Sequence, residues 1–192
     1  HQGITEFLSK KMGRYEKETM LIYNKKLSVS PLTTHIQLKD VSNKIKKSKI
    51  LNNVNLINNF FKRNFNKKPN IGILGLNPHN YSSMRKIDES KIILSAIRTI
   101  KKSKIKVMGP ISPDTSFMLF KKYKLDVIIG MYHDQVLTPF KTLFKYDAIN
   151  ITLGLPCIRV TPDHGVAENI MGKKIANPKS LIECIKFFNH IK

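Results

Sequence analysis

Short apolar runs alternate along this chain with longer amphipathic stretches, and this alternation limits the fold more than any other feature. The runs at 19–23, 70–76, 126–131 and 148–153 have the length and apolar content of buried strands. Between them, the apolar residues of 88–102 recur with the spacing of one helix face. Strands that alternate with helices predict an α/β fold, in which a largely parallel sheet is layered between flanking helices.

The remaining segments fit the same plan. The chain has 192 residues, 41% of them apolar, which is enough to bury a substantial core. From residue 40 to residue 65 the apolar side chains describe one face of a single long amphipathic helix. The other expected helices are 5–12, 113–120, 135–143, 165–171 and 178–191, and the other expected strands are 29–38, 105–108 and 157–160.

The chain is strongly basic, with a net charge of +21. Such an excess attracts polyanions. However, the lysines are spread along the whole chain, and the densest runs, 44–49 and 101–106, contain no aromatic residues for base stacking. Lys, Asn and Ile are over-used together, as an A+T-rich coding sequence would produce. Specific nucleic-acid binding is therefore not expected, although a basic remnant that binds polyanions, with steep salt dependence, remains an alternative.

Membrane insertion and a disulfide framework are both disfavoured by the sequence. No apolar run approaches the roughly 20 residues needed to span a bilayer. The two cysteines, Cys157 and Cys184, lack metal-type spacing and are expected to be free thiols. Free thiols favour a cytoplasmic location.

Three histidines follow predicted strands or extended segments at the point where each ends. They are His35, His79 and His133. In an open α/β sheet, ligands collect at the carboxyl ends of the strands, so these imidazoles predict a metal site at one edge. For any one of them, the alternative is a hydrogen-bonded turn residue. His164 also follows a strand and is interpreted as a helix cap or as a residue that supports the site.

Groups suited to binding an anion follow the His133 turn. Lys141, Asn150 and Arg159 offer a point charge, a neutral donor and a bidentate fork, which together suit a phosphate monoester. The alternative for Lys141 and Arg159 is surface ion pairing. Asp114 lies at a tight turn and is a candidate to orient a histidine or a substrate amine, or to cap a helix. No GxGxxG or P-loop motif is present, so neither standard nucleotide site is predicted.

Several motifs, taken in order, resemble one enzyme family. They are Gly75-Leu76-Asn77-Pro78-His79, Gly109-Pro110 with Pro113-Asp114-Thr115, Met131-Tyr132-His133-Asp134-Gln135, Asn150-Ile151-Thr152-Leu153-Gly154-Leu155-Pro156 and Thr161-Pro162-Asp163-His164-Gly165, with weaker matches at Thr33-Thr34-His35 and 3–7. Together they resemble the 4-hydroxythreonine-4-phosphate dehydrogenase family over nearly all of the chain.

The resemblance implies a reaction in vitamin B6 biosynthesis. NAD or NADP oxidises the 3-hydroxyl of 4-phosphooxy-L-threonine, and the resulting 2-amino-3-oxo-4-phosphooxybutanoate loses carbon dioxide to give 3-amino-2-oxopropyl phosphate. It also implies a divalent metal (zinc, cobalt or magnesium) and a homodimer whose active site is shared between subunits. The implied fold is that of isocitrate and isopropylmalate dehydrogenases, with two α/β domains around a cleft.

The resemblance also assigns residues. His35, His79 and His133 match the family's metal ligands, and the substrate-binding positions match Thr5, Lys141, Asn150 and Arg159. A metal bound to the substrate hydroxyl would lower its pKa as hydride leaves.

The chain departs from the family in three places. Ile4 stands where the family has a histidine, and 80–85 replaces a Gly-rich loop that carries a Glu. The family also has an N-terminal domain upstream of residue 1. We therefore expect a metal- and substrate-binding domain over 1–175 and a C-terminal helix in 176–192 that would pack on the missing domain. The change at Ile4 keeps a related dehydrogenase of threonate or erythronate phosphate open as an alternative.

Overall fold

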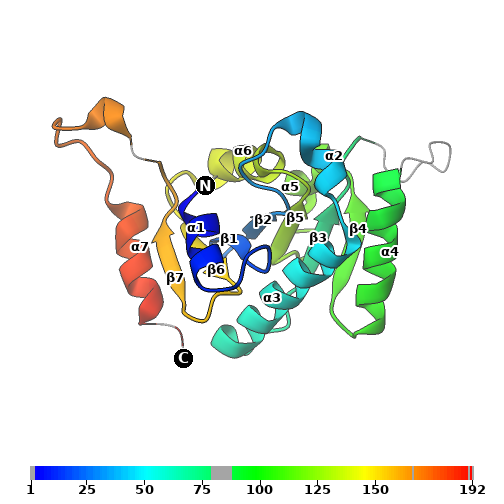
Figure 1. The fold of residues 1–192 in the computed structure, drawn as a ribbon. Coiled ribbons are helices and arrows are strands. Elements are labelled where there is room, and N and C mark those ends of the chain that lie inside the picture. The colour runs from blue at the N-terminus through cyan, green and yellow to red at the C-terminus, as the bar shows by residue number, and fades with distance from the viewer. Residues whose placement is uncertain (1–2, 79–87, 166, 190, 192) are drawn as a thin grey trace.

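The computed structural model describes residues 3–78, 88–165, 167–189 and 191, and within them seven strands form one sheet (Figure 1). The strand order across the sheet is β4-β3-β5-β2-β1-β6-β7. The strands are β1 (Thr19–Tyr23), β2 (Ser28–Pro31), β3 (Ile71–Leu74), β4 (Val107–Ile111), β5 (Val127–Gly130), β6 (Ile149–Leu153) and β7 (Arg159–Pro162).

The sheet is parallel at one end and antiparallel at the other. β2 pairs in parallel with β5, β5 with β3, and β3 with β4. β1 is antiparallel to both β2 and β6, and β7 is antiparallel to β6. Since β6 is reversed twice relative to β2, five of the seven described strands run in the same direction. The predicted α/β layer structure is confirmed, with an antiparallel extension beyond β2.

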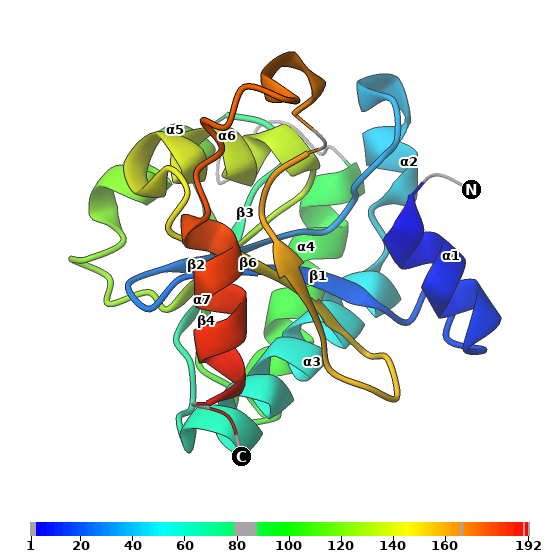
Figure 2. The same ribbon diagram turned by 90° about the vertical axis from the view of Figure 1, so that its left-hand side faces the viewer.

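Helices cover both faces of the sheet, as Figure 2 shows from the side. They are α1 (Ile4–Lys11), α2 (Val41–Lys44), α3 (Lys47–Phe65), α4 (Asp88–Lys102), α5 (Pro113–Leu119), α6 (His133–Phe144) and α7 (Lys179–Phe188), with the 3-10 turns η1 (Leu38–Asp40) and η2 (Glu168–Ile170). α3 and α4 pack together, whereas α6 lies over β2 and β5 and contacts α5. None of these helices is long and apolar enough to cross a membrane.

Strand side chains divide between two hydrophobic cores because successive residues point to opposite faces. Val127 and Ile129 of β5 pack with α3 and α4, while Ile128 packs with α6 in the second core. Leu21 and Ile22 of β1 divide in the same way. A sheet buried on both faces explains why its strands read as continuous apolar runs.

The helix predicted over 40–65 is in fact two helices with a break between them. Ile45 and Lys46 have extended backbones, with ψ of 105° and 141°. The side chain of Ile45 is only 2% exposed and joins the core. The five-residue gap from Ile45 to Ile50 exceeds the three- or four-residue spacing of one helix face, and the break allows both residues to be buried.

The helix predicted over 165–171 is also wrong, since only η2 forms there. Ala167 has a left-handed backbone, with φ of 53°, which interrupts a right-handed helix. No residue of η2 is buried. Without an apolar face to pack, a segment this short does not sustain a helix.

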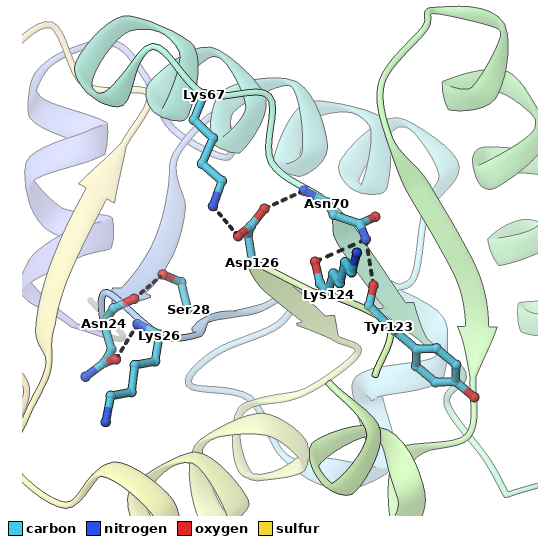
Figure 3. A network of polar contacts seen from close by, with 8 residues as sticks. All are labelled: Asn24, Lys26, Ser28, Lys67, Asn70, Tyr123, Lys124 and Asp126. Atoms are coloured by element: carbon cyan, nitrogen blue, oxygen red, sulfur yellow. Dashed lines mark hydrogen bonds and ion pairs between the residues drawn. The ribbon is translucent and has the colours of Figure 1, made fainter. Parts of the chain in front are cut away.

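At the edge where β5 begins, polar groups fasten the incoming connections (Figure 3). The carboxylate of Asp126 accepts hydrogen bonds from Lys67 Nζ, at 2.5 Å, and from the backbone N–H of Asn70, at 2.9 Å. The amide of Asn70 donates to the carbonyls of Tyr123 and Lys124, at 2.8 and 3.2 Å. These bonds hold the starts of β3 and β5 together, so the register at the opposite edge is fixed as well.

We predict that Phe140→Ala lowers the free energy of unfolding by about 3–5 kcal/mol, because it empties the centre of the α6 core. Phe140 is 0% exposed and stacks against Phe144. Urea denaturation of the purified variant measures the change. Leu143→Ala on the same helix is the control, since Leu143 is 51% exposed and its removal should matter by less than about 0.5 kcal/mol. Equal losses in the two variants would contradict this description of the core.

Candidate functional site

Three loops meet at the edge of the sheet where β2, β5 and β3 end. These strands are parallel neighbours, so their carboxyl ends lie side by side. His35 follows β2 and His133 follows β5. Their imidazole rings lie 6.4 Å apart, centroid to centroid. Two of the three histidines predicted from the sequence are therefore neighbours within a single chain.

His133 is the first residue of α6, where the sequence had placed it in a turn. Its Nδ1 lies 2.7 Å from a carboxylate oxygen of Asp134. A carboxylate at this distance favours the tautomer with the proton on Nδ1 and leaves the Nε2 lone pair available to a ligand. The His133 side chain is 38% exposed, so that nitrogen is accessible.

The third predicted metal ligand, His79, lies outside the described residues. Among the residues that are described, no three His, Cys, Asp or Glu side chains form a ready metal site. A tetrahedral ion bound at about 2.0–2.1 Å would hold two ring centroids about 5 Å apart, roughly 1 Å closer than His35 and His133 lie. The distance between the two ring centroids is therefore close to, but larger than, that of two imidazoles on one ion.

The predicted anion-binding residues are divided between two places. β6 and β7 pair with Asn150 opposite Thr161 and Thr152 opposite Arg159. Since alternate residues share a face, Asn150 and Arg159 lie on the same face of this hairpin. Arg159 Nη1 donates to Thr152 Oγ1 at 2.9 Å and to Thr5 Oγ1 of α1 at 3.2 Å. Thr5, Asn150 and Arg159 therefore form one polar group.

Lys141 belongs to a second group. It lies eight residues beyond His133 on α6, which corresponds to about 12 Å along the helix axis. Lys141 Nζ donates to the main-chain carbonyl of Asp163 at 3.1 Å and lies 3.4 Å from Oδ1 of the same residue. Asp163 follows β7 at the end opposite Arg159. Lys141 and Arg159 therefore make their contacts at opposite ends of β7, and Asn150, which pairs with Thr161, lies between them.

Asp163 is a buried carboxylate, with a side chain only 8% exposed. Burial raises the pKa of Asp163, and the positive charges of Lys141, His133 and His164 oppose that rise. Its backbone N–H donates to Ser180 Oγ, which in turn donates to the carbonyl of Ala148. The first turn of α7 therefore fixes the turn that holds Lys141.

Two atoms in this region carry unsatisfied hydrogen-bonding capacity. Asn150 Oδ1 and Asp163 Oδ2 are buried and have no hydrogen-bond partner among the described residues. Buried acceptors normally have a donor, so each marks a place for a donor from water, ligand or another chain. Both lie on β6 or just after β7, beside the predicted anion-binding residues.

A small cavity of about 170 Å³ lies beside this edge of the sheet. Thr5, Thr33 and Thr34 line it, and it extends toward α3 at Asn53. It is smaller than typical cofactor pockets. A larger cavity of about 480 Å³ lies at the opposite edge, against Tyr23 and Phe187, and contains none of the predicted site residues.

Two other predicted residues make local contacts. The carboxylate of Asp114 accepts a hydrogen bond from Ser112 Oγ at 2.7 Å at the start of α5. His164 Nδ1 lies 3.0 Å from the carbonyl of Gly165, and no helix begins there, so it does not cap one. The orienting role of Asp114 stays a prediction.

The sequence analysis assigned no role to Thr33 and Gln135, although both connect the loops of this edge. Thr33 Oγ1 donates to the carbonyl of Met131 at 2.8 Å. Gln135 is buried and bonds to the loops after β3 and β5. Each lies two residues from a predicted metal ligand. The bond from Thr33 to Met131 joins residues 98 positions apart, and that from Gln135 to Gly75 joins residues 60 positions apart, which no local pattern predicts.

Comparison with known proteins gives a consistent family. A family model described as pyridoxal phosphate biosynthetic protein PdxA matches residues 1–188. The chain is 47% identical over 189 residues to the 4-hydroxythreonine-4-phosphate dehydrogenase of Sulfurihydrogenibium sp. (strain YO3AOP1), covering 97% of this chain and 58% of that relative. The enzyme of the same name from Aquifex aeolicus (strain VF5) is 42% identical over 193 residues, covering 100% of this chain and 59% of the relative.

Comparison with solved structures indicates the same family. The 4-hydroxythreonine-4-phosphate dehydrogenase of Klebsiella pneumoniae superposes with a TM-score of 0.83 at 32% identity, covering 99% of this chain and 58% of that one. The chain therefore spans a little under three fifths of the length of the relatives that it matches.

We predict that Asp163→Asn stabilises the protein relative to the wild type as the pH rises. Because burial raises the pKa of Asp163, the folded state holds its proton more tightly than the unfolded state does. Ionisation therefore weakens folding as the pH rises through the folded pKa, and Asn cannot ionise. Chemical denaturation from about pH 3 to about pH 7 should show the difference, variant minus wild type, increasing with pH. A decrease over that range would contradict the prediction.

Proposed function

The chain belongs to the PdxA family of pyridoxal phosphate biosynthetic proteins, and from that premise we propose that it is the metal- and substrate-binding part of a dehydrogenase. The proposed reaction is the NAD(P)-dependent oxidation of 4-phosphooxy-L-threonine at its 3-hydroxyl. The product, 2-amino-3-oxo-4-phosphooxybutanoate, loses carbon dioxide to leave 3-amino-2-oxopropyl phosphate.

The proximity of His35 and His133 carries this proposal. Their rings come from loops that are far apart in the sequence, and parallel pairing of β2 and β5 places them 6.4 Å apart. The loop that leads to His79 leaves β3, which is the next strand on the other side of β5. Three imidazoles at one sheet edge suit zinc or cobalt better than magnesium, which prefers oxygen ligands.

Different residues of the chain would serve different parts of the proposed oxidation. A divalent ion bound by His35, His79 and His133 would act as a Lewis acid on the 3-hydroxyl and on the developing carbonyl. Asp134 holds the Nδ1 side of His133, so the accessible nitrogen faces the ligand in its unprotonated form. Bound NAD or NADP would accept the hydride from C3, and the hydroxyl proton would leave to a general base.

The polar group of Thr5, Asn150 and Arg159 is proposed to bind the phosphate end of the substrate. Arg159 is already oriented by its bonds to Thr5 and Thr152, so little side-chain freedom is lost on binding. Lys141 would contribute charge from the Asp163 side rather than by direct contact with Arg159. The family pattern assigns Lys141 to the substrate, so the bound substrate is proposed to reach from Arg159 to Lys141.

The nicotinamide site and a second subunit belong to the proposal as well. Because the chain spans 58% of the length of its relative, much of the cofactor cleft is expected from the rest of such an enzyme. The resemblance implies a homodimer with a shared site. The resemblance also implies that the metal ligands are drawn from both subunits, so at least one of the three histidines around each ion is expected from the second subunit.

We predict that alanine at His35, His79 or His133 lowers zinc or cobalt affinity by more than about 100-fold, because each removes a direct ligand. The metal content of the intact protein after dialysis, with NAD reduction in parallel, measures the effect. His164→Ala is the control, since this exposed side chain bonds to the carbonyl of Gly165. Unchanged stoichiometry in His79→Ala and His133→Ala would defeat the metal site.

We predict that 4-phosphooxy-L-threonine is oxidised faster than threonate 4-phosphate or erythronate 4-phosphate. Ile4, which is 69% exposed beside Thr5, offers an apolar surface where the family has a histidine. That change leaves the two acid phosphates as alternatives, because it removes a polar contact from the site. A panel of the three substrates, read by NAD or NADP reduction, decides between them. A higher kcat/KM for either acid phosphate would replace the proposed substrate.

A further inference from the structure

The backbone of Met131 lies at the centre of the edge where the three loops meet. It follows β5 directly, two residues before His133. Its N–H donates to Gln135 Oε1 at 2.7 Å, and its carbonyl accepts from Thr33 Oγ1 at 2.8 Å. Both polar backbone atoms of Met131 are thus bound by side chains, one from the first turn of α6 and one from the loop after β2.

Gln135 extends this connection to the loop after β3. Its Nε2 donates to the carbonyl of Gly75 at 2.9 Å and to that of Leu76 at 3.3 Å. The residue is 9% exposed, so these bonds are sheltered from water. The side-chain amide of Gln135 therefore accepts one hydrogen bond from the segment after β5 and donates two to the loop after β3. Its oxygen and both of its amide hydrogens are used.

Thr33 makes the corresponding connection from β2. Its backbone N–H also donates to the carbonyl of Met131, at 3.2 Å, and the N–H of Leu32 donates to that of Gly130. Thr33 is 1% exposed. The loop that carries His35 is therefore fastened to the loop that carries His133 by backbone and side-chain bonds together.

Gly130 makes room for the amide of Gln135. A Cβ at this position would lie 2.9 Å from Gln135 Oε1 and 2.5 Å from Val136 Cγ1. Any other residue would force the side chains of Gln135 and Val136 to shift. The close approach of strand and helix is thus built into the sequence at the position where the amide must fit.

We propose that Gln135 and Thr33 are positioning residues, which hold the three strand-end loops in register through the backbone of Met131. This inference rests on the proposed metal site. Neither residue touches the metal. Gln135 fixes the position of the backbone that leads to residue 79 relative to His133. Thr33 fixes the position of His35 relative to the backbone of Met131. Groups that orient ligands in this way typically change metal affinity about 10–100-fold when they are lost.

The test is Gln135→Glu, which keeps an acceptor for the N–H of Met131 but replaces the donors that face two carbonyls. Cobalt affinity of the intact protein should fall about 10–100-fold. The visible spectrum of cobalt at saturation should also change, because the ligand geometry is altered. Thr33→Val, which keeps the backbone bond, should lower affinity by less than about 10-fold.

Asn64→Asp is the matched control. Asn64 also donates its part-buried amide to a backbone carbonyl, that of Phe60 at 2.9 Å, but near the end of α3 and away from the site. The same exchange of amide for carboxylate should leave cobalt affinity and the cobalt spectrum unchanged. Equal losses of affinity in Gln135→Glu and Asn64→Asp would show a general loss of stability and overturn the proposal, as would an unchanged affinity and spectrum in Gln135→Glu.

Amide hydrogen exchange separates this inference from the proposed function. Gln135→Glu should speed exchange in residues 75–78, and Asn64→Asp should not. If the wild-type protein binds no cobalt, the proposed function fails, and the exchange result alone decides whether Gln135 holds the loop after β3 in place. Unchanged exchange in 75–78 would overturn the positioning role of Gln135 whether or not cobalt binds.

Discussion

Parallel pairing of β2, β5 and β3 is the constraint on which the candidate site depends. Each of these strands ends at the same edge, so residues that follow them must lie near one another. The pairing is secured from the other edge, where Asp126 and Asn70 fix the starts of β5 and β3 (Figure 3). With the register fixed there, His35 and His133 are placed by backbone geometry before any side chain contacts a ligand.

The antiparallel part of the sheet has a different role. β6 and β7 present a polar face with Asn150, Thr152 and Arg159, and α1 reaches it through Thr5. Because β7 runs back along β6, Arg159 lies at one end of the hairpin and Asp163 follows the other. α6 connects the two parts, with His133 at its start and Lys141 near its end. A ligand that contacts both His133 and Lys141 must extend along α6.

The sequence predicted what depends on local pattern and missed what depends on long-range pairing. The strand at 19–23 was predicted with its final bounds, because its apolar run stands between polar segments. The proximity of His35 and His133 followed from the rule on strand ends. The different hydrogen-bond partners of Lys141 and Arg159 were not predicted, since they depend on the reversed direction of β7. The contacts of Gln135 and Thr33 were missed for the same reason: their partners are distant in the chain.

One residue inside α6 affects how this site can respond to a bound ion. Pro139 has no amide hydrogen, so the carbonyl of Gln135 does not receive the helical bond that residue 139 would otherwise donate. The helix therefore lacks one internal bond between its histidine-bearing turn and the segment that buries Phe140. The first turn depends for its position on the side-chain bonds of Gln135 to Met131 and Gly75, so an ion held by His133 would be tied to the sheet more directly than to the rest of the helix.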